Sequence, residues 1–225
     1  MKKTTLFLLL ICLKVSFSQN NDERKIGDFY KLQTYDLLKI NLIKSDINKV
    51  IVNGKHSDYV VVKNKNGNLK IRMSLEKRLS GSETRVDLYY KKIYRVEAKE
   101  GSNIFSNDTI IEPSLYLRAE SGASINAKIK TSDLKIKSLT GGRVFLSGLA
   151  NHNEIDAFTG GQVLAKKLIT ETTQVNIKAG GFVGVHATSF LELDLKAGGQ
   201  ANVYYKTNKI VEKITLGGIV NYLYK

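Results

Sequence analysis

The chain has 225 residues, with 35 Lys and Arg against 21 Asp and Glu, which gives a formal net charge of +14. It contains one cysteine, Cys12, which lies in a segment that we expect to be removed. We therefore expect a mature chain without disulfides, thiolate metal sites or a cysteine nucleophile. Length and composition predict one basic domain.

Residues 1–18 are typical of an export signal. Lys2 and Lys3 precede an apolar run from Leu6 to Leu13, and Ser16-Phe17-Ser18 provides a small-x-small cleavage site. The apolar run is too short to span a membrane, so we expect no transmembrane segment. Cleavage after Ser18 would leave a single domain over 19–225, located in the periplasm, on the outer surface or secreted.

Residues 29–98 alternate apolar and polar side chains in short runs. The runs that predict strands are 38–43, 50–52, 59–62, 69–73 and 86–90. Asn53-Gly54 and Asn66-Gly67 provide turns between them, and 77–85 reads as a loop. We expect this part to form irregular capping coils, and we expect no helix after the signal.

A glycine doublet recurs through residues 99–225. The doublets are Gly141-Gly142, Gly160-Gly161, Gly180-Gly181, Gly198-Gly199 and Gly217-Gly218, with weaker copies at Gly101-Ser102 and Gly122-Ala123. Counted from the first glycine of each copy, the intervals are 21, 19, 19, 20, 18 and 19 residues. A period near twenty that tolerates slips of one or two residues is typical of a solenoid.

Aligning the copies reveals the core. Apolar residues fill the positions three and five after the first glycine, and three and five before it, while polar residues stand between them. This pattern predicts two strands per coil, joined at a glycine corner that needs positive φ and close stacking. The prediction is an all-β, single-stranded, right-handed parallel β-helix with coils of about 18–21 residues, the hand being taken from the general rule for parallel crossovers.

An export signal, a strand-rich opening that includes Leu69-Lys-Ile-Arg72, and repeated Ala/Thr-Gly-Gly coils together resemble the head GIN domain family. The resemblance runs from about Phe29 to Tyr224, and the degraded doublets at Gly101-Ser102 and Gly122-Ala123 depart from it. It implies an exported β-helical protein of the kind described in Bacteroidota as auto-transporter adhesins. It brings no established catalytic residues.

Exported β-helices also include enzymes that act on acidic polysaccharides, and their sites need clustered carboxylates. Here Asp156 and Asp194 share one outward column with Asn176 between them, so a calcium ion would have to span two coils, about 9.6 Å. Glu154 and Glu192 are related in the same way. We interpret these carboxylates as solvated strand faces, and we predict no catalytic residue, metal or cofactor.

The three histidines, His56, His152 and His186, fall on separate coils without ligand spacing, so we predict turn or surface roles for them. His152 is expected in a turn formed by Asn151-His152-Asn153.

Apolar residues at outward positions near the corners predict a binding surface. They form two pairs on adjacent coils and one single residue: Leu139 with Phe158, Phe145 with Leu164, and Phe182. Such strips can stack sugar rings or receive another protein. The alternative is that the N-terminal segment or a loop covers them.

Removal of Lys2, Lys3 and Lys14 with the signal lowers the net charge from +14 to +11. A basic surface attracts anionic polymers, although solubility explains the same charge.

We predict a non-enzymatic cell-envelope or secreted module with adhesin-like binding of an anionic surface polysaccharide or an envelope protein, and no specific nucleic acid. The alternative is a scaffold that assembles end to end through open terminal coils; an acidic-polysaccharide lyase is a remote third.

Overall fold

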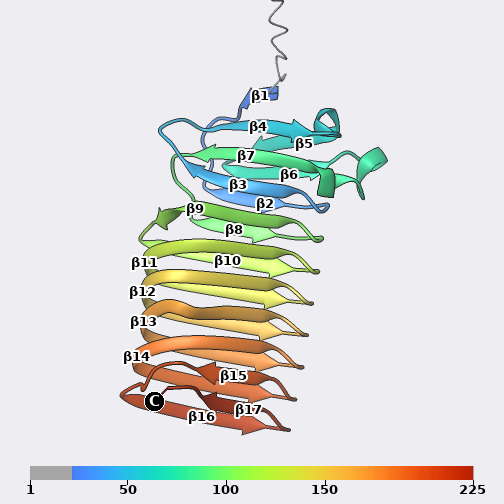
Figure 1. Ribbon diagram of the computed structural model, residues 1–225. Coiled ribbons are helices and arrows are strands. Elements are labelled where there is room, and N and C mark those ends of the chain that lie inside the picture. The colour runs from blue at the N-terminus through green and yellow to red at the C-terminus, as the bar shows by residue number, and fades with distance from the viewer. Residues whose placement is uncertain (1–21, 225) are drawn as a thin grey trace, which may run out of the picture.

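The computed structural model describes residues 22–224 and shows an all-β solenoid (Figure 1). Seventeen strands form one continuous sheet that winds round a single core. The predicted signal peptide, 1–18, and the cleavage site after Ser18 lie outside the described residues. Within residues 22–224, no helix is long and apolar enough to cross a membrane.

Seven strands and three short 3-10 turns make up the N-terminal part. They are β1 (Asp22–Lys25), β2 (Lys31–Thr34), β3 (Lys39–Lys44), β4 (Lys49–Gly54), η1 (Ser57–Tyr59), β5 (Val60–Lys65), β6 (Asn68–Met73), η2 (Leu75–Lys77), η3 (Gly81–Glu83) and β7 (Thr84–Tyr90). The five predicted strand runs of this part are confirmed as β3 to β7.

The remaining ten strands form the regular coils. They are β8 (Arg95–Ala98), β9 (Asn103–Ile111), β10 (Ser114–Glu120), β11 (Ser124–Leu139), β12 (Arg143–Phe158), β13 (Gln162–Lys178), β14 (Phe182–Lys196), β15 (Gln200–Val203), β16 (Lys209–Thr215) and β17 (Ile219–Tyr222). Each strand pairs in parallel with its copy in the next coil, as the repeat predicts.

In the middle coils, the two strands predicted between successive glycine corners form a single continuous strand. Strands β11 to β14 each run for 15 to 17 residues, because the corner opposite the glycines is a bend in a continuous strand. The expectation that His152 lies in a turn is therefore wrong, since His152 is a residue of β12 and pairs in register with Thr172.

Each glycine corner is a tight turn in which the two glycines have different roles. At one corner Thr140 and Gly141 both adopt positive φ, 48° and 70°, and the Gly142 amide donates to the Leu139 carbonyl over 2.9 Å. Two successive positive φ values define a type I′ turn, which favours glycine at its second central position. The second glycine of the doublet lets the backbones of neighbouring coils lie close together, as Gly161 shows at the next corner. A Cβ on Gly161 would lie 1.9 Å from the Ser138 carbonyl oxygen of the preceding coil.

The predicted core columns are buried throughout the stack. The column five residues before each first glycine is exposed by 1% or less in six successive coils, at Val96, Leu117, Ile136, Ile155, Val175 and Leu193. At about 25 cal/mol for each Å² of apolar surface removed from water, such columns supply the main stabilisation of the fold.

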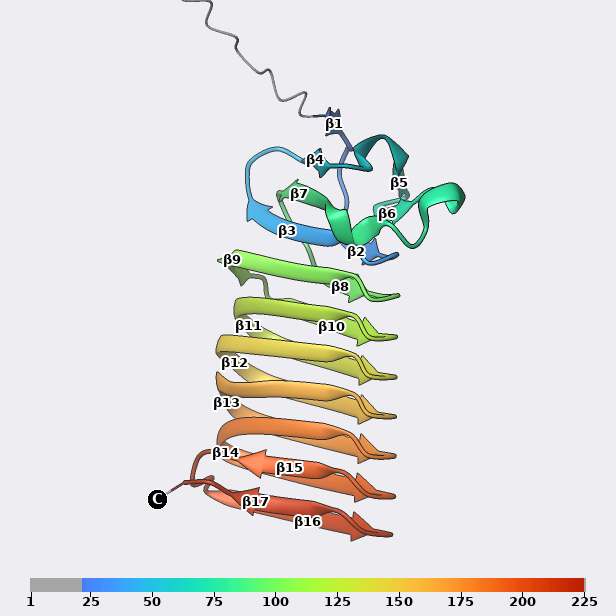
Figure 2. The ribbon, with the colours of Figure 1, turned by 45° about the vertical axis from the view of Figure 1, so that its right-hand side comes forward.

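The N-terminal coils do not stack in chain order. Strand β2 lies between β6 and β8, and β3 lies between β7 and β9, all in parallel. The chain therefore builds one coil from β2 and β3 and places β4 and β5 farther out. It then returns through β6 and β7, which lie next to the first coil, and starts the regular stack on the other side of that coil (Figures 1 and 2). Strand β4 pairs antiparallel with β7, and β1 antiparallel with β4, so this end is closed by a different pattern.

A network of polar side chains joins β2 to β8 on the outer face. Glu97 is 2% exposed and accepts a hydrogen bond from Gln33 Nε2 over 2.8 Å. Arg95 pairs with Glu97, and the ammonium groups of Lys31 and Lys99 each lie 3.3 Å from its oxygens. Burial alone would raise the pKa of Glu97, but these hydrogen bonds and positive charges lower it to about 2. We call these five residues the junction network.

The C-terminal coil is open. Within residues 22–224, strands β16 and β17 pair with β14 and β15 on one side only. Ile214 and Tyr222, which stand in core columns, are 46% and 43% exposed. Glu212 occupies the inward position that Leu193 holds one coil earlier. An inward charge on an edge strand opposes the addition of another strand.

Candidate binding trough

Two hollows adjoin on the outer face of the strands that follow the glycine corners. The larger, about 440 Å³, is lined mainly by apolar and aromatic residues: Phe145, Leu164, Phe182, Gly184 and Tyr204, with Lys166 and Lys167 at its edge. The other, about 430 Å³, is lined by Lys39, Asn41, Arg85, Phe105, Ser106 and Asn107. Asn126 lines both. We call the two hollows together the trough; it runs along the solenoid axis.

Gly184, which has no side chain, lies at the floor of the apolar hollow. The ladder of outward residues runs from Phe145 to Leu164 and then to Gly184 on adjacent coils. A Cβ on Gly184 would lie 3.0 Å from Cε2 of Tyr204, so the glycine allows the tyrosine ring to lie against the backbone. The Tyr204 ring and the Gly184 backbone therefore form part of the floor of this hollow.

A bulge in β13 raises the basic edge of this hollow. Between Leu164 and Ile169 the strand holds four residues, whereas its partner β14 holds only Val185 between Gly184 and His186. Bulges redirect side chains and are common next to functional sites. This bulge places Lys166 Nζ 4.8 Å from the centre of the Tyr204 ring, across the intervening coil.

The second hollow is built in the same way but is more polar. Strand β9 holds three residues between Phe105 and Thr109 where β11 holds one, and two of these, Ser106 and Asn107, line the hollow. Phe105 is 42% exposed. Arg85 pairs with Asp87 over 2.8 Å, so its charge is partly balanced.

The trough therefore combines partly exposed rings with cations. No acidic side chain of the described chain lines either hollow, and Lys166 and Lys167 carry the charge beside the rings. Aromatic faces pack against apolar faces of a ligand, and cations pair with its anionic groups. The arrangement is suited to binding and offers no paired carboxylates for general acid–base catalysis.

The predicted surface residues divide into two groups. Phe145, Leu164 and Phe182 line one hollow, and the described N-terminal strands do not cover it. Leu139 and Phe158 are ladder partners of each other, but they precede the glycine corners and do not line the trough. Lys178 Nζ lies 5.0 Å from the centre of the Phe158 ring.

Sequence reasoning missed Gly184, Tyr204 and the bulge. Gly184 does not belong to a corner doublet, so its position in an outward column was an available signal. The bulge leaves only a weak trace, an interval of 20 residues before Gly180 and of 18 after it.

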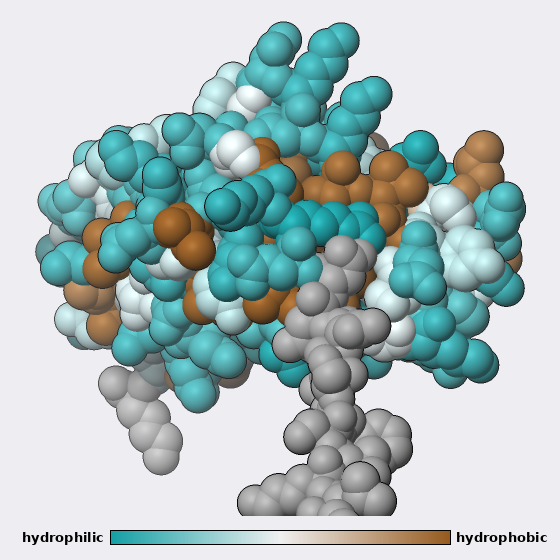
Figure 3. All heavy atoms as spheres, turned by 90° about the horizontal axis from the view of Figure 1, so that it is seen from above, coloured by the Kyte–Doolittle hydropathy of each residue, from teal (hydrophilic) through white to brown (hydrophobic). Residues whose placement is uncertain are grey.

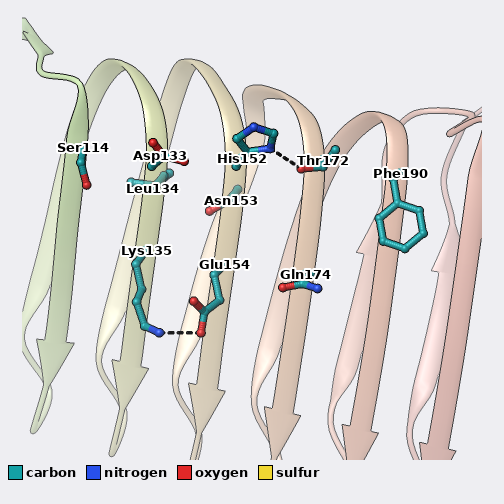
Figure 4. Close-up of a pocket in the computed structure, with 10 residues that line it drawn as sticks. All are labelled: Ser114, Asp133, Leu134, Lys135, His152, Asn153, Glu154, Thr172, Gln174 and Phe190. Carbon is teal, nitrogen blue, oxygen red and sulfur yellow. Dashed lines mark hydrogen bonds and ion pairs between the residues drawn. The ribbon is translucent and has the colours of Figure 1, made fainter.

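The opposite outer face carries a polar hollow of about 460 Å³ on the strands that precede the corners (Figure 4). Lys135 Nζ contacts Glu154 over 2.6 Å, and His152 Nδ1 shares a hydrogen bond of 2.9 Å with Thr172. Figure 4 shows these pairs on neighbouring strands, with Phe190 at one end of the hollow. Four of the side chains that line this hollow thus bond to one another.

The carboxylates weighed as a calcium site have other partners. Asp156 pairs with Lys137 over 3.1 Å and accepts a hydrogen bond from Asn176 over 3.2 Å, while Asp194 pairs with Lys196 over 2.8 Å. Among residues 22–224, no group of three His, Cys, Asp or Glu is placed to hold a metal ion.

The other two histidines are also apart. His186 stacks on Tyr205 with ring centres 4.8 Å apart, and His56 Nε2 lies 3.5 Å from a Glu83 oxygen.

Comparison with known proteins decides the family. The model of the family described as "Putative auto-transporter adhesin, head GIN domain" matches residues 28–208. The chain belongs to this family. No match was found among curated proteins.

Solved structures share the fold of this head GIN domain protein at low sequence identity. A putative adhesin from Bacteroides fragilis has a TM-score of 0.81 at 14% identity, covering 90% of this chain and 96% of that one. A putative adhesin from Parabacteroides merdae has a TM-score of 0.65 at 17% identity, covering 90% and 95%. A protein from Parabacteroides distasonis named as a putative lipid binding protein has a TM-score of 0.65 at 15% identity, covering 90% and 96%. At these identities the likeness concerns the fold.

Proposed function

We propose that this chain is a non-enzymatic, exported binding module that holds an acidic polysaccharide along the trough. The observation that carries the proposal is the Tyr204 ring lying against Gly184, flanked by Phe182 and by the two lysines that the β13 bulge presents. Membership of a family described as adhesins supports a binding role.

The form of the trough supports a polymer rather than a small ligand. Its two hollows share Asn126, and aromatic rings recur along its length at the exposed Phe105 and the half-buried Phe145, two coils apart, or about 9.6 Å. Sugar rings present apolar faces that pack on aromatic side chains, and uronate carboxylates would pair with Lys166 and Lys167.

The test is binding of polygalacturonate to the purified mature chain, measured by calorimetry, with neutral dextran as the control polymer. Phe182→Ser with Tyr204→Ser should weaken binding roughly tenfold or more, because stacking surface is lost. The matched control is Leu139→Ser with Phe158→Ser, which removes the same kind of side chain outside the trough. Equal binding by both double variants would overturn the proposal.

The lysines are tested separately. Lys166→Gln with Lys167→Gln should weaken binding and reduce its dependence on salt, since two ion pairs are removed. Lys63→Gln with Lys65→Gln changes the charge equally at a distant surface and should leave binding nearly unaltered. A lyase would instead release unsaturated products that absorb ultraviolet light, and we expect no such rise.

Export through residues 1–18 is part of the same proposal. The first residue of the mature protein should be Gln19, which N-terminal sequencing of protein recovered from the envelope or medium would show. A mature protein that begins at Met1 would contradict it.

An end-to-end scaffold is the second candidate. The unpaired edges of β16 and β17 and the exposure of Ile214 and Tyr222 favour it. Glu212, at an inward position of the same coil, opposes it.

A further inference from the structure

One coil has an insertion in place of the glycine corner. Where the regular coils turn through a glycine, the coil made by β6 and β7 turns through residues 74–83, which include η2 and η3. This corner insertion projects beyond the row of corners below it (Figure 1). It carries Leu75 and Leu79, which are 80% and 85% exposed and line one hollow of about 660 Å³ together with Leu37.

The base of the insertion is tied to the body of the protein. Arg78 pairs with Asp36 over 3.1 Å and with Glu100 over 3.0 Å. Gly81 packs so closely that a Cβ there would lie 1.9 Å from the Asp36 carbonyl oxygen. Leu75 and Leu79 are thus held out in water by a fixed base, an arrangement that contributes nothing to the core.

Strand β6, which leads into the insertion, forms a basic hairpin with β5. Lys63 stands directly opposite Lys70, a like-charge pair that disfavours the hairpin. Lys65 and Arg72 add to the charge, and within the described residues none of the four forms an ion pair with an acidic side chain. Protection of the edge strand β5 would explain Lys63 and Lys65, but Lys70 and Arg72 are on the inner strand.

We propose that this end of the solenoid docks on an anionic lipid surface. Leu75 and Leu79 enter the boundary between headgroups and acyl chains, and the basic hairpin lies over the anionic headgroups. Apolar tips beside unpaired cations are the combination that an interfacial anchor requires. A soluble polyanion would leave the two exposed leucines in water, whereas an anionic lipid surface receives both the leucines and the cations.

A single tryptophan can report insertion, because the chain contains none. Leu79→Trp should shift its emission to the blue when phosphatidylcholine vesicles containing phosphatidylglycerol are added, and should not shift with phosphatidylcholine alone. The control is Ile219→Trp in the open C-terminal coil, an exposed residue at the opposite end, which should show no shift.

Vesicle flotation separates the two contributions. Leu75→Ser with Leu79→Ser should lower the partition coefficient roughly tenfold or more, because two apolar side chains are lost at sites that are already exposed. Lys63→Gln with Lys70→Gln should lower it by a similar factor, at about 1 kcal/mol per cation. The matched control, Lys166→Gln with Lys167→Gln, should float like the wild type.

Several outcomes would overturn the proposal. These are the absence of a blue shift in Leu79→Trp, equal binding to neutral and anionic vesicles, unchanged flotation of the serine variant, and self-association through the leucines without lipid. Binding to the trough is measured with polygalacturonate, and binding to lipid is measured with vesicles. A negative result in one assay therefore does not contradict the other proposal.

Discussion

The junction network and the trough both lie on the outer face of the solenoid, but their side chains are used differently. Around Glu97 each charge meets an opposite charge or an amide, and the carboxylate is almost fully buried. Around Gly184 the rings of Phe182 and Tyr204 are only partly covered, and no carboxylate of residues 22–224 lines the hollow beside Lys166 and Lys167. Polar groups that satisfy one another stabilise a fold, while groups left open are available to a ligand.

The largest expected effect comes from breaking the stack that carries the trough. Gly161→Ala should lower the free energy of unfolding by about 3 kcal/mol or more, because its Cβ would overlap the Ser138 carbonyl and neither backbone can move freely. Gly160→Ala is the control; at φ 73° its Cβ would approach no atom closer than the Gly141 nitrogen at 4.0 Å, so it should cost only about 1–2 kcal/mol. Urea denaturation of both variants measures the difference, and equal losses would contradict the two roles assigned to the doublet.

The next largest effect is expected in the junction network and concerns the stability of the protein. Glu97→Gln should lower the free energy of unfolding at pH 7 by roughly 3 kcal/mol, because four partners lose their shared carboxylate. Polygalacturonate binding should remain unchanged in this variant, since Glu97 does not line the trough. A stable variant with impaired binding would reverse the roles of the two regions.

The same carboxylate predicts a pH dependence. The pKa of Glu97 is about 2 in the folded protein, below its ordinary value of 4.5. Its contribution is therefore complete above about pH 4.5 and is lost as the pH falls towards 2. Denaturation curves between pH 6 and about pH 2 should show a steeper loss for the wild type than for Glu97→Gln; parallel curves would contradict this assignment.

A smaller effect concerns the open C-terminal coil. Glu212→Val places an apolar side chain in the inward column, so self-association should strengthen roughly tenfold or more once no carboxylate has to be buried. Sedimentation equilibrium over a range of concentrations measures it, with Lys213→Val, an outward position of the same strand, as the control. Wild-type protein that already assembles into long chains would instead support the scaffold.

The smallest effect is expected for stability in the trough. Phe182→Ser should change the free energy of unfolding by less than about 0.5 kcal/mol, because the ring packs on the surface rather than in the core. Thermal unfolding checks it. A large loss of stability would show that the ring is part of the packing and would remove the reason to regard it as a contact for ligand.

The sequence was a sound guide where the structure repeats. The corners and core columns were predictable because each depends on residues within one coil and its nearest copy, as at Thr140-Gly141 and along the Val96 column. The placement of β2 and β3 between later coils was not, since it depends on pairing between distant segments that no local pattern encodes. The right-handed sense of winding stays a prediction.

The trough shows the same division. Phe145, Leu164 and Phe182 could be predicted from their outward positions near the corners. Lys166 lies close to the Tyr204 ring because β13 has a bulge and because Gly184 in β14 has no side chain between them. Such irregularities change the spacing by one or two residues, which a repeat of variable length conceals.

The most direct test of a ligand-binding trough is a crystal structure of the mature chain with a short oligogalacturonate. Sugar rings should pack on Phe182 and Tyr204, with a carboxylate beside Lys166 or Lys167. Sugar bound only at the basic hairpin, or an empty trough at saturating ligand, would contradict it.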